Sequence, residues 1–331
     1  MIDVIRWGVL GAARIADQFV VPALQRSRNN RVVAVAARDP VRAAAFAGRH
    51  GIEHVLEHYE DALDATNIDA IYIALPTALH FDWCKRALLA GKHVLCEKPI
   101  AMHAREVEEL AALRDLTGKL CAEAFMVAHH PQWDYVRDCL AQGLLGELKL
   151  VEASFSYFNE DPNALKNDRA LGGGGVRDIG VYPVVTTRLA TGLEPHRVES
   201  EVEIDTRFGT DRYASARVAF PGFDLRFYCA TQLARRQQMT FHGTRGWLSL
   251  EAPFNPGVYG EPFVHLRTDA TASIRTEIFA GFDQYQLMVE DFADVLLRAR
   301  PTPRFTLENS FRNQRVIDEI LLQHCDAGPP D

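Results

Sequence analysis

The chain has no paired-cysteine motif and no long apolar run. Its cysteines never form a Cys-x-x-Cys pair, and several fall within apolar or helical patterns, as buried free thiols do. Asp3 stands where a secretion signal would be basic, and no apolar run reaches the length of a membrane span. We therefore expect a soluble, unprocessed, cytoplasmic protein that keeps its thiols reduced at Cys84, Cys96, Cys121, Cys139, Cys229 and Cys325.

The chain also lacks an excess of basic residues. Lys and Arg number 36 against 44 Asp and Glu, which gives a formal net charge of −8. Such a charge disfavours polyanions over the molecule as a whole, although one local basic pocket can still hold a single phosphate. Nucleic acid is therefore not an expected partner.

No metal site is expected either. His50, His54 and His58 are spaced by four residues, which resembles a ligand pattern. Metal binding needs convergent geometry that spacing alone does not supply, and His54 falls in a predicted strand. The neighbouring Glu53 and Glu57 are read as ordinary surface acids.

The length of the chain favours two domains. A chain of 331 residues with 47% hydrophobic residues exceeds the size at which a single core usually splits. Apolar runs at residues 4–10, 31–37 and 70–75 are typical of strands buried on both faces. Helical patterns at 14–26, 41–49 and 80–89 lie between and after them, and a strand, a helix and a strand follow at 93–96, 105–116 and 120–124. This alternation predicts an α/β fold, with a doubly wound parallel (Rossmann) sheet over residues 1–124.

After residue 126 the pattern changes to alternating segments divided by turn signals such as Pro221-Gly222. Strands are expected at 148–157, 198–205, 213–220, 223–228, 239–241 and 247–250. Helices are expected at 133–141, 178–190, 284–299 and 308–323. These segments predict a second, α+β domain over residues 125–331, built on a large and mostly antiparallel sheet.

A glycine-bearing turn follows the first predicted strand. The dinucleotide fingerprint Gly-x-Gly-x-x-Gly appears here as Gly11, Ala13 and Ala16, and alanine is the smallest departure from glycine. Backbone donors of such a turn can hold a pyrophosphate at a helix N-terminus. A tight strand-to-helix corner is the alternative interpretation. The predicted cofactor contacts are Gly11, Ala12, Ala13, Arg14 and Ile15.

The end of the second predicted strand indicates which cofactor binds. An acid at this place engages the ribose of NAD, whereas an arginine accommodates the 2′-phosphate of NADP. Arg38 stands at that place, and Arg42 lies one helical turn further on. NADP is therefore favoured and NAD remains open, because Asp39 could also reach a ribose hydroxyl. Solvated surface arginines are the alternative.

Lys98 is the first candidate for chemistry. The run Glu97-Lys98-Pro99 ends a predicted parallel strand, and ligands of open α/β sheets lie beyond the strand C-termini. The segment after the preceding strand supplies further predicted cofactor contacts. With Glu97 and Lys98 themselves, these are Leu75, Pro76, Thr77 and His80, where His80 either touches the nicotinamide ribose or only caps its loop.

At this point the chain resembles the glucose-fructose oxidoreductase and inositol dehydrogenase (Gfo/Idh/MocA) family over nearly its whole length. The resemblance rests on motifs in the family's order and spacing. They are the glycine turn at 11–16, Pro76-Thr77 with His80, Glu97-Lys98-Pro99, Glu123-Ala124-Phe125-Met126, and the run from Gly172 to Tyr182.

The resemblance implies that Lys98 lies near the nicotinamide and that the helix opened by Asp178 completes the site. Many relatives carry histidine at the position of Tyr182, and the tyrosine resembles the branch with glucose-fructose oxidoreductase, xylose dehydrogenases and dihydrodiol dehydrogenases. A phenol of pKa about 10 is a poor base unless a cation stabilises the phenolate, and Lys98 can be that cation. Tyr182 is then the acid/base, and Asp178 orients Lys98 or a substrate hydroxyl. A core tyrosine and a helix N-cap are the structural alternatives.

Three functions are open at this stage. The first is an NADP-dependent oxidoreductase of a sugar or cyclic polyol, oxidising an aldose at C1 to the lactone. The second is a trans-diol dehydrogenase or a keto-sugar reductase, and the third is a nucleotide-sensing regulator without catalysis. Predicted substrate contacts are Met126, Phe155, Arg169 and Phe282. The exposed face of the second sheet is expected to pair with another subunit, giving a homodimer or a dimer of dimers.

Overall fold

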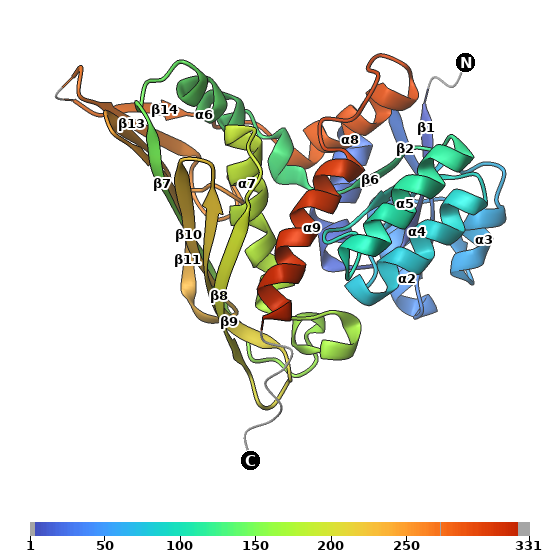
Figure 1. Cartoon of the computed structure of the whole chain (residues 1–331). Coiled ribbons are helices and arrows are strands. Elements are labelled where there is room, and N and C mark those ends of the chain that lie inside the picture. The colour runs from blue at the N-terminus through green and yellow to red at the C-terminus, as the bar shows by residue number, and fades with distance from the viewer. Residues whose placement is uncertain (1–3, 272, 324–331) are drawn as a thin grey trace. The chain divides into compact units, whose positions relative to one another are not determined.

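The structure is a computed structural model that describes residues 4–271 and 273–323 (Figure 1). It divides into two compact units, which are described separately. Unit 1 comprises residues 1–129 and 283–311, and unit 2 comprises residues 130–282 and 312–331. The predicted division after residue 124 gives each domain one continuous stretch of chain. Unit 1 differs because it also includes residues 283–311. Cys325 lies outside the described residues, and the other five cysteines are free and buried.

Unit 1 is built on a six-stranded parallel sheet in the order β3-β2-β1-β4-β5-β6, which confirms the predicted doubly wound fold. The strand order reverses between β1 and β4, and ligands of such sheets lie at that switch point. The strands are β1 Ile5–Leu10, β2 Asn30–Ala36, β3 His54–Leu56, β4 Ala70–Ile73, β5 His93–Cys96 and β6 Cys121–Glu123.

Helices cover both faces of this sheet. On one face an apolar cluster joins the strands to α3, α4 and α5. On the other face α1 and α8 pack together, and Phe292 of α8 meets Trp7 of β1 at 5.1 Å between ring centroids. The helical segments are η1 Ala16–Val20, α1 Val21–Arg26, α2 Pro40–His50, α3 Tyr59–Asp64, η2 Thr77–Leu79, α4 His80–Leu89, α5 Ala104–Thr117, η3 Met126–His129 and α8 Gln284–Leu296.

Unit 2 is built on an eight-stranded sheet in the order β14-β13-β12-β11-β7-β10-β9-β8. Only β7 and β10 pair in parallel among the described strand pairs, so the mostly antiparallel prediction is confirmed. The strands are β7 Leu148–Phe158, β8 Arg197–Ile204, β9 Asp211–Phe220, β10 Phe223–Ala230, β11 Gln232–Gly243, β12 Gly246–Leu250, β13 Phe263–Thr268 and β14 Arg275–Ile278.

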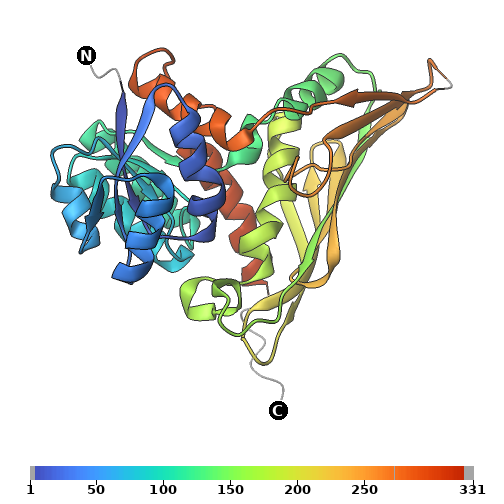
Figure 2. The same cartoon turned by 180° about the vertical axis from the view of Figure 1, so that it is seen from behind.

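Helices cover one face of the unit 2 sheet, as the view from behind shows for α6 and α7 (Figure 2). In strand β7 the apolar Val151, Ala153 and Phe155 are buried and Glu152 is exposed, while Ser154 and Ser156 are also buried. The helical segments are α6 Gln132–Ala141, η4 Leu165–Asn167, η5 Arg169–Leu171, η6 Val176–Gly180, α7 Val181–Thr191 and α9 Leu307–Leu322, of which α9 begins in unit 1.

Two predicted helices, over 14–26 and 178–190, are helical along their whole length but contain a π-helical turn near the start. These turns are η1 before α1 and η6 before α7. Pro22 and Pro183 stand near the start of the following α-helices and cannot donate the backbone hydrogen bond that a continuous α-helix needs. Asp178 therefore lies in the π turn, and Tyr182 lies in the α-helix that follows it.

Neither a membrane span nor a metal cluster is found within residues 4–271 and 273–323. No helix there is both long enough and apolar enough to cross a bilayer. No three His, Cys, Asp or Glu side chains there are grouped as metal ligands would be. His50 instead contacts Asp17 at 2.7 Å, and His54 begins the edge strand β3.

Candidate active site

The fingerprint loop of unit 1 lies where three strand ends meet. Gly11 has a φ of +99°, and a Cβ added there would lie 2.4 Å from the carbonyl oxygen of Ala74, so only glycine fits without strain. Its N–H donates to the Ala36 carbonyl oxygen at 2.8 Å. The loop then passes through the half-buried Ala12 and Ala13 and the exposed Arg14 into η1. The first glycine of the fingerprint thus has the role that a dinucleotide-binding turn requires.

One of the two arginines after β2 contacts that loop. Arg42 donates from Nη2 to the carbonyl oxygen of Ala12 at 3.2 Å. The Asp39 carboxylate accepts from the N–H groups of Val41 and Arg42 and caps α2. The Asp39 carboxylate is therefore already bound to the backbone of α2. The guanidinium of Arg42 places a positive charge at the fingerprint loop. These residues fit a 2′-phosphate better than a free ribose hydroxyl.

Tyr59 is a neighbour of this basic pair that the sequence did not indicate. Burial raises the pKa of Tyr59, and the nearby Arg38 and Arg42 act in the opposite direction. Its hydroxyl lies near the backbone of Arg38 and its ring meets Trp83 edge-on, so Tyr59 anchors the segment that carries Arg38. No sequence motif marks a single tyrosine at the start of a short helix.

Lys98 follows the carboxyl end of β5 in unit 1. The preceding Glu97 accepts a hydrogen bond from the Tyr72 hydroxyl at 2.6 Å, and burial raises the pKa of Glu97. The side chain of Glu97 therefore packs back onto β4. Lys98 itself is half-buried and is joined to Pro99 by a cis peptide bond.

His80 opens α4 and is almost completely buried, with 1% of its surface exposed. Its Nδ1 lies 2.7 Å from the carbonyl oxygen of Pro99, and its Nε2 lies 2.8 Å from that of Leu75. Both ring nitrogens thus contact backbone oxygens of unit 1. Of the two roles considered for His80, this supports the one in which it caps its loop rather than the one in which it touches the nicotinamide ribose. Pro76 and Thr77 lie in the same segment after β4.

Tyr182 lies in α7 of unit 2 and is 3% exposed. Its ring contacts Phe155 of β7 at 5.4 Å and Phe254 at 5.5 Å between centroids. Phe155 and Phe254 stack on each other at 5.2 Å. The tyrosine is therefore held by an aromatic wall, and Phe155, a predicted substrate contact, is part of that wall.

Phe254 was not foreseen, because it follows β12 in a segment without regular periodicity. Gln132 of α6 donates from its amide to the carbonyl oxygens of Ala252 and Pro253, at 3.3 and 3.0 Å. These bonds fix the backbone just before Phe254. A buried glutamine is unusual unless it is paired, and its pairing here explains why Gln132 has no exposed surface.

Asp178 forms a cluster with two residues of unit 2. Its Oδ2 accepts a hydrogen bond from the Tyr157 hydroxyl at 2.6 Å and pairs with the Lys166 ammonium at 3.3 Å. That ammonium also lies over the Tyr157 ring, 4.1 Å from its centroid. Burial and the adjacent carboxylate raise the pKa of Tyr157, which therefore remains a donor at neutral pH. The structure thus adds two partners of Asp178 that the sequence left out.

The glycine run before η6 packs against Asp211 of β9. A Cβ added at Gly174, where φ is +126°, would lie 2.0 Å from Oδ1 of Asp211, and the Val176 N–H donates to Oδ2 of Asp211 at 2.6 Å. Burial raises the pKa of Asp211 to about 6. At Gly174 the backbone thus lies against the Asp211 carboxylate, which caps the first turn of this helical segment.

The remaining predicted substrate contacts are Arg169 and Phe282 in unit 2 and Met126 in unit 1. Arg169 is exposed in η5, and Phe282 is 52% exposed and meets the His130 ring edge-on. Met126 is buried in η3 of unit 1.

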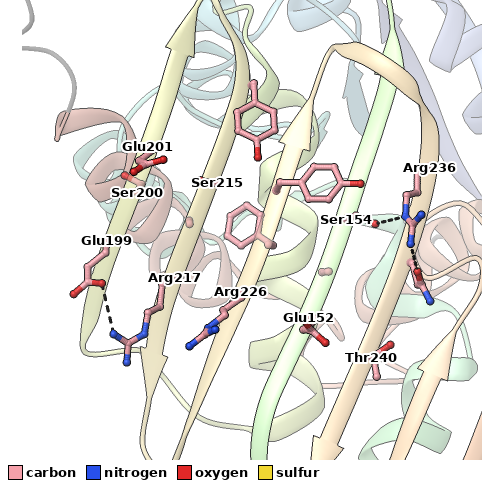
Figure 3. Close-up of a pocket in the computed structure, with 16 residues that line it drawn as sticks. Glu152, Ser154, Glu199, Ser200, Glu201, Ser215, Arg217, Arg226, Arg236 and Thr240 are labelled. Atoms are coloured by element: carbon pink, nitrogen blue, oxygen red, sulfur yellow. Dashed lines mark hydrogen bonds and ion pairs between the residues drawn. The ribbon is translucent and has the colours of Figure 1, made fainter.

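The open face of the unit 2 sheet holds a broad polar hollow of about 800 Å³ (Figure 3). Charges of both signs line it, and Arg217 pairs with Glu199 at 3.6 Å while Arg236 donates to Ser154 at 3.3 Å. Neighbouring strands bring Arg226 beside Arg217 on one side and Glu152 on the other. Three aromatic residues, Tyr213, Phe227 and Tyr228, also line this hollow. Neither Tyr182 nor its neighbours Phe155 and Phe254 are among the lining residues, so we do not assign the reaction to it.

Two family models match the chain. The model described as oxidoreductase family, NAD-binding Rossmann fold, matches residues 5–125, and the GFO/IDH/MocA C-terminal domain matches residues 133–249. Together they cover more than half of the chain.

Relatives match over nearly full length. An uncharacterized oxidoreductase of Rhizobium meliloti is 39% identical, covering 96% of both chains. The dTDP-3,4-didehydro-2,6-dideoxy-alpha-D-glucose 3-reductase of Actinomadura kijaniata is 33% identical, over 96% of this chain and 94% of that one. D-xylose 1-dehydrogenase (NADP(+)) 2 of Haloferax volcanii is 33% identical, covering 95% of both.

A solved structure agrees over the same extent. KijD10, a 3-ketoreductase from Actinomadura kijaniata in complex with NADP and TDP-benzene, superposes with a TM-score of 0.88 at 30% identity, covering 96% of this chain and 97% of that chain. The agreement of family models, sequence relatives and structure confirms the resemblance seen in the motifs. The chain therefore belongs to the Gfo/Idh/MocA family of oxidoreductases.

Proposed function

We propose that this chain is an NADP-dependent sugar oxidoreductase in which Tyr182 is the acid/base and Lys98 assists it. One observation carries the assignment of these two residues. Solved variants of KijD10 replace one lysine and one tyrosine that lie 84 positions apart, which is also the spacing of Lys98 and Tyr182. NADP in those complexes and the NADP(+) xylose dehydrogenase relative support the cofactor.

The residues of this chain divide the chemistry between them. The nicotinamide, when bound, accepts or supplies the hydride. Oxidation of a hydroxyl also requires a group that takes its proton, and Tyr182 has that role, returning the proton in reduction. The Lys98 ammonium stabilises negative charge on the reacting oxygen and on the phenolate. Asp178, held by Tyr157 and Lys166, orients a second substrate hydroxyl.

The proposed substrate is an aldose oxidised at C1 to the lactone, as the xylose dehydrogenase relative supports. A keto-sugar reductase is the second candidate, because the Actinomadura kijaniata relative and KijD10 are named as 3-reductase and 3-ketoreductase. Both reactions use the same hydride step in opposite directions.

A substrate screen separates these candidates. Aldoses, inositols and trans-diols are offered with NADP and NAD, keto-sugars and their nucleotide-linked forms with NADPH, and the reduced cofactor is followed by its absorbance. We expect turnover of an aldose with NADP. Turnover confined to keto-sugars would replace the first candidate by the second, and tight nucleotide binding without turnover would contradict an enzyme.

Cofactor preference is expected to depend on Arg38 and Arg42. A charge-assisted hydrogen bond contributes about 1.5–3 kcal/mol, so removing one arginine should weaken NADP binding about 10- to 100-fold. Arg38→Ala and Arg42→Ala should therefore raise the Kd of NADP and leave that of NAD nearly unchanged. Fluorescence titration with the reduced cofactors measures both, and Arg31→Ala, near the start of the strand β2 that precedes Arg38, is the control. Equal weakening of NAD and NADP would count against a 2′-phosphate contact.

We also propose that two copies of the chain pair through the open face of the unit 2 sheet. The hollow there carries Arg217, Arg226 and Glu199 in adjacent strands, which offers charges of both signs to a second copy. Light scattering of the purified protein should give at least twice the mass of one chain, and a monomer at micromolar concentration would contradict the pairing.

A further inference from the structure

The strongest unexplained feature of unit 1 is the pair of short contacts around His80. The residue is buried, yet its two ring nitrogens lie 2.7 and 2.8 Å from carbonyl oxygens of two different segments. Leu75 follows β4, and Pro99 follows β5. One side chain thus contacts both loops at the carboxyl ends of adjacent strands. A neutral ring donates to one of the two oxygens, and a protonated ring donates to both.

A second buried side chain holds the same loop from its other side. Glu123, at the end of β6, accepts a hydrogen bond from the Ile100 N–H at 3.0 Å. Burial raises the pKa of Glu123 to about 7, and contact with Ser310 acts against that rise. Glu123 is 4% exposed, so its hydrogen bonds replace those that water would make.

These contacts converge on the backbone that carries Lys98. The carbonyl of Pro99 and the N–H of Ile100 are one and two residues beyond Lys98, and the side chain of Glu97, one residue before it, is bound by Tyr72. When the backbone is fixed on both sides of a residue, the position of its Cα and the direction of its Cα–Cβ bond are fixed as well. A charge that must meet a reacting oxygen benefits from such restriction, because misplacement by 1 Å can cost about 100-fold in rate.

We propose that His80 and Glu123 are positioning residues for Lys98, with His80 joining the loops after β4 and β5 and Glu123 holding the loop after β5 against β6. The proposal rests on the function proposed for Lys98. It assigns His80 a task distinct from cofactor contact, since its ring nitrogens already meet the carbonyl oxygens of Leu75 and Pro99.

The first test follows Lys98 directly and needs no turnover. The chain contains only six lysines, so reductive ¹³C-methylation gives a small set of NMR signals, and the Lys98 signal is the one missing in Lys98→Met. His80→Ala and Glu123→Ala should each shift or broaden that signal. The signals of Lys149 and Lys166, which belong to unit 2, should stay where they are.

Matched variants separate positioning from general damage. His93 lies at the opposite end of β5 and accepts from the Leu120 N–H at 2.9 Å, so His93→Ala removes a comparable bond away from Lys98. It should leave the Lys98 signal unchanged. Glu123→Gln should also keep the signal near its wild-type place, because an amide oxygen can still accept from Ile100. If His80→Ala fails to fold, His80→Gln, which retains a donor, replaces it.

The second test is kinetic. His80→Ala should lower kcat about 10- to 100-fold, with a change in the Kd of NADP of less than about threefold. Combined with Lys98→Met it should cause almost no further loss, because both changes remove the same contribution. Losses that multiply, or a folded His80→Ala with wild-type kcat and an unmoved Lys98 signal, would overturn the positioning role. Wild-type kcat in Lys98→Met would instead refute the proposed function of Lys98, and the NMR test of its position would still stand.

Discussion

Replacing Lys98 by methionine is expected to lower kcat by about 10²- to 10⁴-fold, the range usual for groups that assist proton transfer. Methionine has a similar length and no charge, so it removes the cation while filling much of the same space. The half-buried position after β5 makes this charge stronger than one in bulk water. Steady-state turnover with the substrate found in the screen measures the loss.

Two controls give this result its meaning. Lys98→Arg keeps the charge but presents a planar, longer group, so partial recovery at most is expected. The Kd of NADPH for Lys98→Met, followed by fluorescence, should change by no more than a few-fold, because the main cofactor contacts are assigned to the fingerprint loop and the arginines. A variant that binds NADPH normally and turns over at the wild-type rate would remove Lys98 from the reaction.

Replacing Tyr182 by phenylalanine should lower kcat by a similar factor of about 10² to 10⁴. The substitution removes one oxygen and keeps the ring, so contacts with Phe155 and Phe254 remain. Loss of one hydroxyl hydrogen bond costs about 1 kcal/mol, which leaves the fold intact. The fall in rate should therefore come without a comparable fall in the midpoint of urea unfolding.

Tyr157 provides the matched control for Tyr182. It is a half-buried tyrosine of unit 2, and its hydroxyl donates to Asp178. Tyr157→Phe should raise KM more than it lowers kcat, since it acts through the orientation of Asp178. If Tyr157→Phe lost as much kcat as Tyr182→Phe, or Tyr182→Phe lost none, the assignment of Tyr182 as the acid/base would fail.

The fold follows largely from local patterns. The helix expected at 80–89 is α4 with the same bounds, because its apolar face and the stop at Gly91 both lie within the segment itself. The strands of unit 1 are short and apolar, and their alternation with helices leaves a parallel sheet as the architecture that buries them. Such signals need no knowledge of distant residues.

The partners of the candidate residues could not be predicted in this way. Asp178 meets Tyr157, 21 residues earlier, and Val176 meets Asp211, 35 residues later. From the sequence, Gly174 is interpreted as a flexible loop residue. In the structure Asp211 occupies the space that a Cβ at this position would need. Similarly, His80 meets Pro99 across 19 residues and a strand. Only tertiary structure brings these pairs together, so the sequence indicates the residues and not their contacts.

A crystal structure of the complex with NADP and the screened substrate tests the account most directly. We expect Nζ of Lys98 and the hydroxyl oxygen of Tyr182 both to lie within about 3.2 Å of the same substrate oxygen. The hydrogen on the carbon that bears this oxygen should face the nicotinamide. If the two groups faced different cavities, or contacted different substrate atoms, the proposed division of labour between lysine and tyrosine would be contradicted.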